Sequence, residues 1–163
     1  MHVAQKAESA ALQFVLRSTQ ARPQTEAELR AKLRSRGYPE PLIAAALQQA
    51  AALGAVDDAA FAKAWVVDRG LTRGFSVLRL REELRRRGIP EPLIDPALQA
   101  VETRNDLAMA TELARERARR MPATLTPQTV ARRLIGFLGR RGYPEALARR
   151  VAIDVSGLDR QWD

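Results

Sequence analysis

The sequence contains no cysteine and a single histidine, His2. Without cysteine the chain can form neither a disulfide nor a thiolate metal site, as is typical of proteins that stay in a reducing cytosol. One histidine near the start of the chain cannot supply a zinc-binding cluster or a base held beside a nucleophile. We therefore expect no metal and no other cofactor, and we expect a cytoplasmic protein.

Long apolar runs are also missing, and aromatic residues make up only 5% of the chain. A helix that crosses a membrane needs about 20 consecutive apolar residues, so we expect no membrane segment. The apolar residues near the N-terminus are spaced as in an amphipathic helix rather than grouped as in a signal peptide. These features predict a soluble protein, and we expect it to be a monomer.

Motifs that position a nucleophile or a phosphate group are absent as well, since neither G-x-S-x-G nor G-x-x-x-x-G-K-[ST] occurs. The glycine-rich segment GFLGRRG at 136–142 falls in or just after a predicted helix, where packing or capping explains its glycines better than phosphate binding. The adjacent acids Asp57–Asp58 and Glu82–Glu83 diverge on a helix surface, which favours capping or solvent exposure over a shared metal or proton. We therefore predict no catalytic residues and a protein that is not an enzyme.

What the chain does contain is an internal repeat. Gly37, Gly88 and Gly142 mark the same position in three similar segments, at spacings of 51 and 54 residues. Leucines recur at matching offsets before each of these glycines. Repeats of this period are typical of arrays of small helical units. The three segments are LRSRGYPEPLI at 33–43, LRRRGIPEPLI at 84–94 and LGRRGYPEALA at 138–148.

Each copy predicts three helices. The middle helix has leucines four apart and ends in arginines, which face the negative end of the helix dipole. The glycine that follows can take the left-handed conformation that closes a helix, and the next proline fits a first helical turn. At the start of the first helices, Asp57, Asp58, Asn105 and Asp106 occupy capping positions. Around Pro96 two alternatives stay open: a helix that begins at the proline, or an earlier helix that the proline kinks.

We predict an all-α fold of nine helices in three tandem three-helix repeats. The repeats are expected at 8–54, 55–103 and 104–155, and a C-terminal tail is expected at 156–163. One copy of about fifty residues would be marginally stable alone, so neighbouring copies must pack against each other. Such stacking predicts an elongated, curved array.

The chain carries 27 basic and 19 acidic side chains, a net charge of +8. A surplus of this size favours an acidic partner, although it also serves solubility. Compensation of the helix dipole explains one or two arginines at each helix end. If the copies stack in register, the arginines would also form a row suited to a phosphate backbone or an acidic groove. The candidate partner- and nucleic-acid-binding residues are Arg34, Arg36, Arg69, Arg73, Arg79, Arg81, Arg85, Arg86, Arg87, Arg132, Arg133, Arg140 and Arg141.

The segment GAVDDAAFAKAWVVDR at 54–69 resembles the RecX family, regulators of the RecA recombinase. Its glycine, paired aspartates, Phe-Ala pair, tryptophan and arginine match the family pattern, and the resemblance extends over roughly residues 8–155. The matching residues are Gly54, Asp57, Asp58, Phe61, Ala62, Trp65 and Arg69, followed by Gly74, Leu80, Glu83, Leu84, Gly88, Ile89, Ile94, Ala97 and Leu98.

The resemblance implies three tandem three-helix repeats and a non-enzymatic negative regulator of RecA. Such a protein would bind the RecA filament on single-stranded DNA, in its groove and across adjacent protomers, and inhibit its ATPase, strand exchange and co-protease activities. Some family members also bind single- or double-stranded DNA weakly. Two alternatives fit the residues: a sequence-independent DNA-binding protein, and a helical-repeat scaffold for another acidic partner.

Overall fold

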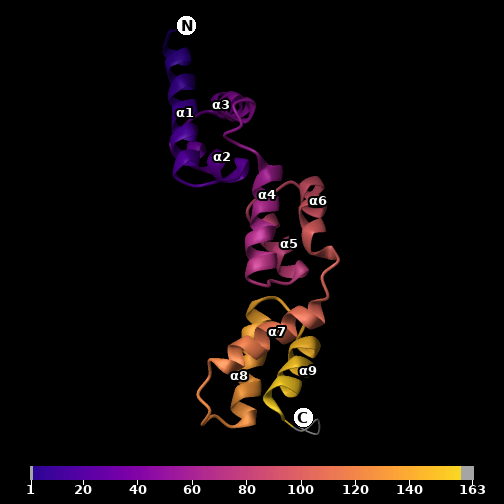
Figure 1. Cartoon of the computed structure of the whole chain (residues 1–163). Helices are drawn as coiled ribbons and strands as arrows, with labels where there is room; N and C mark the ends of the chain where they lie inside the picture. Colours follow the sequence, from indigo (N-terminus) through magenta and orange to yellow (C-terminus); the bar gives the residue numbers. More distant parts are fainter. Residues whose placement is uncertain (1, 159–163) are drawn as a thin grey trace. The chain divides into compact units, whose positions relative to one another are not determined.

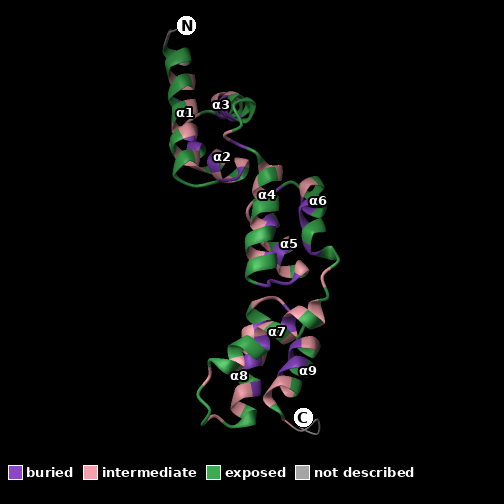
Figure 2. Cartoon of the chain, viewed as in Figure 1, coloured by how far each residue is buried: buried purple, intermediate pink, exposed green. Residues whose placement is uncertain are grey.

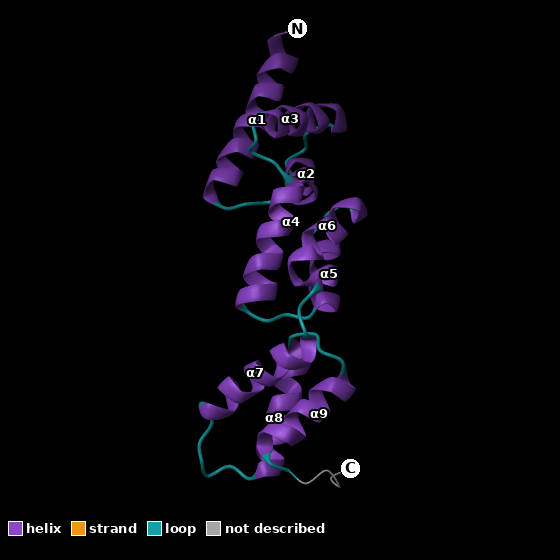
Figure 3. Cartoon of the chain, turned by 45° about the vertical axis from the view of Figure 1, so that its right-hand side comes forward, coloured by secondary structure: helices purple, strands orange, loops and turns teal. Residues whose placement is uncertain are grey.

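The computed structural model describes residues 2–158, except for the side chains of His2 and Ala4. This part of the chain contains nine α-helices, one short π-helix and no strand (Figure 3). The predicted all-α fold of nine helices is therefore confirmed, whereas residues 159–163 of the predicted tail lie outside the described residues. The α-helices are labelled in Figure 1. In chain order the helices are α1 (His2–Ala21), α2 (Glu26–Ser35), α3 (Glu40–Ala52), α4 (Asp58–Val66), η1 (Val67–Thr72), α5 (Val77–Arg86), α6 (Glu91–Glu102), α7 (Asp106–Arg119), α8 (Pro127–Arg140) and α9 (Glu145–Ser156).

The predicted caps and glycines lie at the helix ends. The Asp57 carboxylate accepts a hydrogen bond from the Ala60 N–H at 2.9 Å, and the Asn105 side chain accepts one from Ala108 at 3.0 Å. Each bond satisfies a backbone donor that the first helical turn leaves without a partner. The three repeated glycines all have positive φ, as predicted for a left-handed helix closure: 82° at Gly37, 76° at Gly88 and 85° at Gly142.

One segment differs from its prediction. Glycine and threonine in the segment RGLTRGFS at 69–76 predict a loop, but α4 continues directly into the π-helix η1 over Val67–Thr72, and only residues 73–76 are non-helical. A β-carbon on Gly70 would lie 2.9 Å from Val101 and 3.0 Å from Leu80, so the absence of a side chain lets this wide turn pack closely. Arg104 stabilises the segment, because its guanidinium donates to the carbonyls of Gly70 at 2.7 Å and Phe75 at 2.8 Å. Local turn signals could not reveal this distant partner.

The position of Pro96 resolves the alternative left open by the sequence. Helix α6 begins at Glu91, and Pro96 lies inside it. Since proline has no N–H, the helix lacks the hydrogen bond that residue 96 would otherwise donate to the carbonyl of Pro92.

Contacts divide the chain into two compact units. The first unit comprises residues up to Trp65 together with Glu83–Ala97, and the second unit comprises Val66–Glu82 together with the residues from Leu98 onward. The division passes through the middle predicted repeat, so each unit contains one junction between successive repeats. The boundaries predicted for the three repeats themselves stay a prediction.

Each unit has its own apolar core. In the first unit α1 packs against α3, with α2 alongside, and the leucines of α2 are fully buried. In the second unit α9 packs against both α7 and α8, and the leucines of α8 are buried in the same way (Figure 2). Leucines four apart in these middle helices thus face the cores, as their spacing predicts. They are Leu29, Leu33, Leu134 and Leu138.

The junction in the first unit joins α2 to the end of α5. Thr25, whose exposed fraction is 0%, caps α2 and donates its hydroxyl to the carbonyl of Arg87 at 2.7 Å. The backbones approach so closely here that a β-carbon on Gly88 would clash with the β-carbon of Ala27. Gly88 is therefore required twice, for its positive φ and for the close contact between repeats.

The junction in the second unit has the same design. Ser76 follows Thr25 at the repeat spacing of 51 residues, is also buried, and donates its hydroxyl to the carbonyl of Gly142 at 2.7 Å. A β-carbon on Gly142 would lie 2.5 Å from both the Ser76 hydroxyl and the Arg79 side chain. The buried Tyr143 hydroxyl adds a second bond by donating to the carbonyl of Gly74 at 2.6 Å. Burial raises the pKa of Tyr143 to about 12.

Gly37 and Gly88 offer a matched test of the junction in the first unit. Gly37 and Gly88 both have positive φ, but a β-carbon on Gly37 would meet no atom within 4 Å. We expect Gly37→Ala to lower the free energy of unfolding by about 1 kcal/mol through backbone strain alone. Gly88→Ala should lower it by about 2–4 kcal/mol, because the clash with Ala27 adds to that strain. Urea unfolding measures both values, and equal losses would contradict a close-packed junction at Gly88.

Tyr143 predicts a change of stability at alkaline pH. An ordinary tyrosine has a pKa of 10.0, and that of folded Tyr143 is about 12. The unfolded chain therefore loses this proton first, and the stability contributed by Tyr143 is present below pH 10 and is lost as the pH rises through about 12. Below pH 10, Tyr143→Phe should be less stable by about 1 kcal/mol, the value of one hydrogen bond. The difference from the native protein should shrink as the pH rises further, whereas a constant difference would contradict the shifted pKa.

Candidate functional site

Two predicted arginines of the first unit form the same ion pair in successive copies of the repeat. Arg34 binds Glu40 at 3.0 Å, and Arg85, at the corresponding position of the next copy, binds Glu91 at 2.6 Å. Both pairs are about half exposed, and such pairs stabilise a fold by only about 0–1 kcal/mol. These two arginines therefore remain accessible to a partner, although each already has an acidic neighbour.

Arg87 is held in place by contacts with other residues of the first unit. Its guanidinium binds the Glu28 carboxylate at 2.8 Å and lies over the Trp65 ring at 4.3 Å from the ring centroid. Trp65 stacks on Phe61 with centroids 5.8 Å apart, and its indole N–H donates to Glu83 at 3.0 Å. Because Glu28 and Arg87 belong to successive copies, this ion pair lies at the junction of the first unit. Arg87 therefore stabilises the packing of the first unit.

Arg36 and Arg86 complete the predicted set in the first unit. Arg36 lies over the Phe14 ring at 4.2 Å, beside a hollow of about 390 Å³ that Arg17 and Tyr38 also line. Arg86 is exposed, and no ion pair or hydrogen bond joins it to another described residue. Of the triple arginine at 85–87, Arg86 is thus the member most available to a partner.

The other predicted arginines belong to the second unit. Arg69 and Arg73 lie near the Asp68 carboxylate, at 3.1 Å and 3.5 Å. Arg79 lies over the Phe75 ring at 4.0 Å, and Arg81 is half-buried on the same helix, α5. Three more arginines are exposed on α8: Arg132, Arg133 and Arg140.

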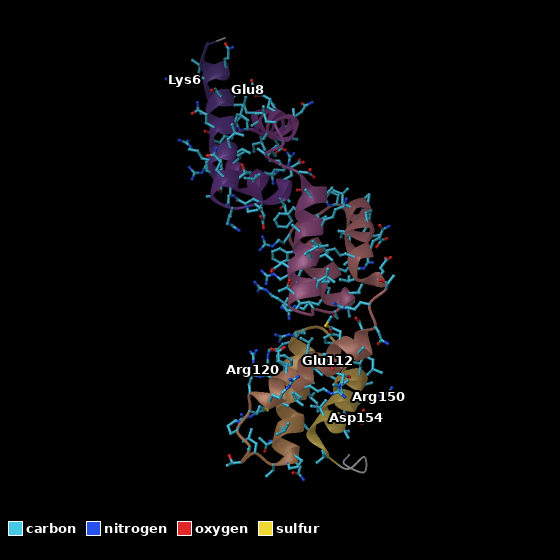
Figure 4. All side chains as sticks on the ribbon, viewed as in Figure 1. Lys6, Glu8, Glu112, Arg120, Arg150 and Asp154 are labelled. Atoms are coloured by element: carbon cyan, nitrogen blue, oxygen red, sulfur yellow. The ribbon has the colours of Figure 1, made fainter. Side chains whose placement is uncertain are left out.

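A basic pocket of about 300 Å³ lies within the second unit. It is formed by the end of η1, by α7 and by α8, each with the residue that directly follows it: Arg73, Arg120 and Arg141. Four guanidinium groups and one carboxylate line it, which gives the lining a net charge of +3. Glu112 of α7 and Arg120, which directly follows this helix, are labelled in Figure 4. The lining residues are Thr72, Arg73, Leu113, Glu116, Arg117, Arg120, Phe137 and Arg141.

Arg141 is partly buried in this pocket. Its guanidinium lies 3.9 Å from the centroid of the Phe137 ring, and its Nε donates to the carbonyl of Arg73 at 3.3 Å. Burial lowers the pKa of Arg141, and the nearby cations Arg79 and Arg140 lower it further. The pocket therefore concentrates positive charge, which a bound anion would compensate.

Two pocket residues, Arg117 and Arg120, were missed from the sequence. They belong to the basic run RERARR at 115–120 in the predicted first helix of the third copy, whereas most of the predicted binding arginines lie on the middle helices. The run was a usable signal, but its proximity to Arg73 and Arg141 depends on tertiary packing. A single row of arginines along all three copies stays a prediction.

Two further features of the described chain bear on function. Among residues 2–158, no group of three or more histidine, cysteine, aspartate or glutamate side chains could hold a metal ion. None of the described helices combines the length and the apolar character needed to cross a bilayer.

Three-helix units with exposed arginines define a helical-repeat protein with a basic surface. Comparison with known proteins identifies the family. Residues 11–49 match the family description "RecX, first three-helix domain", and residues 57–98 match "RecX, second three-helix domain".

Curated relatives cover most of the chain. A regulatory protein RecX of Mycobacterium avium (strain 104) is 36% identical over 154 residues, which are 94% of this chain and 89% of that protein. Another, of Amycolatopsis mediterranei (strain U-32), is 39% identical over 130 residues, which are 80% and 74% of the two chains. The chain belongs to the RecX family.

Solved structures show the same fold. The crystal structure of RecX from Lactobacillus salivarius superposes with a TM-score of 0.71 at 17% sequence identity, over 92% of this chain and 97% of that chain. A second crystal structure of regulatory protein RecX gives a TM-score of 0.68 at 22% identity, over 91% and 73% of the two chains.

The adjacent residues Arg86 and Arg87 allow a test that distinguishes an arginine that stabilises the fold from one that is only exposed on the surface. Arg87→Gln removes the bond to Glu28 and the contact with Trp65, and should lower the free energy of unfolding by about 1–2 kcal/mol. Arg86→Gln removes an exposed side chain and should change it by less than about 0.5 kcal/mol. Both variants lose one positive charge, so chemical denaturation compares them directly. Equal stability of the two would contradict the structural role of Arg87.

Proposed function

We propose that this protein is a negative regulator of RecA that binds the RecA filament on single-stranded DNA and inhibits its ATPase, strand exchange and co-protease activities. Membership of the RecX family is the observation that carries this proposal. Exposed arginines in both units supply a basic surface for an acidic filament. The chain would contact adjacent RecA protomers in the groove of the filament.

Inhibition by binding alone needs no catalytic residue. A bound protein shifts a conformational equilibrium only if it binds one state more tightly than the other. A chain of packed helical units can contact several protomers at once and can therefore favour one arrangement of the filament over another. The closely packed junctions at Gly88 and Gly142 support this mechanism, since they keep the contact surfaces of each unit in fixed positions.

Sequence-independent DNA binding is the second candidate function. It is favoured by the net charge of +8 and by the exposed arginines Arg86, Arg132 and Arg133, which have no hydrogen bond or ion pair to another described residue. Phosphate binding of this kind weakens steeply as the salt concentration rises, because each neutralised phosphate releases a counterion. A RecA-specific effect should persist at salt concentrations where direct DNA binding is already weak.

The decisive measurement is RecA ATPase activity on single-stranded DNA with the purified protein added below the RecA concentration. We expect inhibition of the ATPase, because one chain bound to several protomers affects more than one active site. The combined variant Arg86→Gln, Arg132→Gln and Arg133→Gln should keep its stability and require about tenfold more protein for the same inhibition, the effect of about 1.4 kcal/mol of binding free energy.

A control variant loses the same charge elsewhere. Arg115→Gln, Arg119→Gln and Arg149→Gln change three exposed arginines, two of which pair with Glu112 and Glu145 on their own helices. This control should inhibit RecA nearly as well as the native protein. Absence of inhibition by the native protein would overturn the proposal, and equal weakening of both variants would assign the effect to net charge.

A further inference from the structure

We propose that the basic pocket of the second unit is a binding site for a phosphate group. The pocket is lined by Arg73, Arg117, Arg120 and Arg141 around a space of about 300 Å³. This assignment goes beyond the regulation of RecA, because it concerns a ligand that the free protein would bind by itself.

The charges in the pocket are only partly compensated by the protein. Arg120 binds Glu116 at 2.5 Å, and Arg73 lies 3.5 Å from Asp68. Arg117 and Arg141, by contrast, form no ion pair with any described residue. Two guanidinium groups with unused N–H donors therefore face the same space. Burial is the main cause of the lowered pKa of Arg141, and repulsion from nearby cations, which an anion would relieve, adds to it.

The arrangement of the donors favours phosphate over a carboxylate. Arginines reach the pocket from η1, from α7 and from the end of α8, so they approach a ligand from several directions. A tetrahedral phosphate offers oxygens in several directions and carries up to two charges, whereas a carboxylate offers two oxygens in one plane. Guanidinium groups bind such oxygens in bidentate pairs. Thr72 also belongs to the lining.

The walls of the pocket would strengthen this binding. Phe137 lies close to two cations, with the Arg141 and Arg117 guanidinium groups at 3.9 Å and 5.7 Å from its centroid. Leu113 forms another apolar wall and lies directly against Gly74, where a β-carbon would approach it to 2.6 Å. Apolar walls lower the local dielectric constant and so increase the attraction between an anion and the arginines. A volume of 300 Å³ is at the small end of ligand pockets, which favours one small group.

The hollow in the first unit supports this choice of site by comparison. It also has an arginine stacked on phenylalanine, Arg36 on Phe14, but only Arg17 adds a second cation. The pocket of the second unit has twice as many arginines within a smaller space. A multiply charged anion should therefore prefer the second unit.

Calorimetric titration of the native protein with pyrophosphate, at constant ionic strength, tests the proposal. We expect saturable binding at one site. Arg117→Gln should weaken this binding about tenfold, the usual effect of losing a charge-assisted hydrogen bond. Arg119→Gln removes an equal charge from the same helix outside the pocket lining and should weaken binding less than about twofold. Glu116→Gln should strengthen binding, because it removes the only carboxylate of the lining, and it provides a second test if Arg117→Gln fails to fold.

Two further ligands identify the source of the phosphate. One is a short oligothymidylate without a terminal phosphate, which offers only phosphodiester groups, and the other is an oligoglutamate peptide, which offers only carboxylates. Binding of pyrophosphate that depends on Arg117 assigns the pocket to free phosphate groups. Binding of oligothymidylate alone, with the same dependence, assigns it to a nucleic-acid backbone. Preference for oligoglutamate, equal effects of Arg117→Gln and Arg119→Gln, or no saturable binding of either phosphate ligand would overturn the proposal.

Discussion

A buried hydroxyl that caps one middle helix binds the carbonyl at the end of the next middle helix, and the packing of successive repeats depends on this contact. Thr25 makes it to Arg87 in the first unit, and Ser76 makes it to Gly142 in the second. A buried hydroxyl without a partner would be costly, so the contact stabilises one alignment of the two helices. Glycine makes the contact possible, because only a residue without a side chain permits both the positive φ and the close approach.

The turns at the three repeated glycines also determine where several arginines lie. The residue directly before each repeated glycine is Arg36, Arg87 or Arg141, and each guanidinium lies over an aromatic ring at 3.9–4.3 Å. In the middle copy this position is also bound by Glu28 from the preceding copy, whereas Arg141 lines the basic pocket of the second unit. One sequence position thus serves packing in one copy and contributes to a candidate binding site in another.

Regulation of a filament by binding requires surfaces rather than an active site, and the chain is consistent with that requirement. Its charge is carried largely by arginine, whose planar guanidinium can stack on a ring and still donate hydrogen bonds at its edge. Stacking holds such a side chain in place before a partner arrives, which reduces the entropy lost on binding. The few aromatic residues of the chain have this role repeatedly: Phe14, Trp65, Phe75 and Phe137 each lie beneath an arginine.

Local patterns predicted most of the fold. Leucines four apart, capping residues and glycines after basic helix ends are signals within about twelve residues, and the structure confirms them at Leu29, Asp57 and Gly88. The loop predicted for residues 69–76 begins only after Thr72, since Arg104, far along the chain, stabilises a π-helix over the first half of that segment. Arg117 and Arg120 were missed for a similar reason, because their neighbours in the pocket come from other helices.

The sequence by itself determined the helices, their repetition and the resemblance to the RecX family, because helix formation and apolar spacing depend on near neighbours. Tertiary structure alone decided which arginines are used for packing and which face a common pocket. The triple arginine at 85–87 illustrates the difference: three identical side chains became an exposed ion pair, an exposed cation and a junction contact. Their environments come from Glu91, from solvent and from Glu28, and only the folded chain brings Glu28 to Arg87.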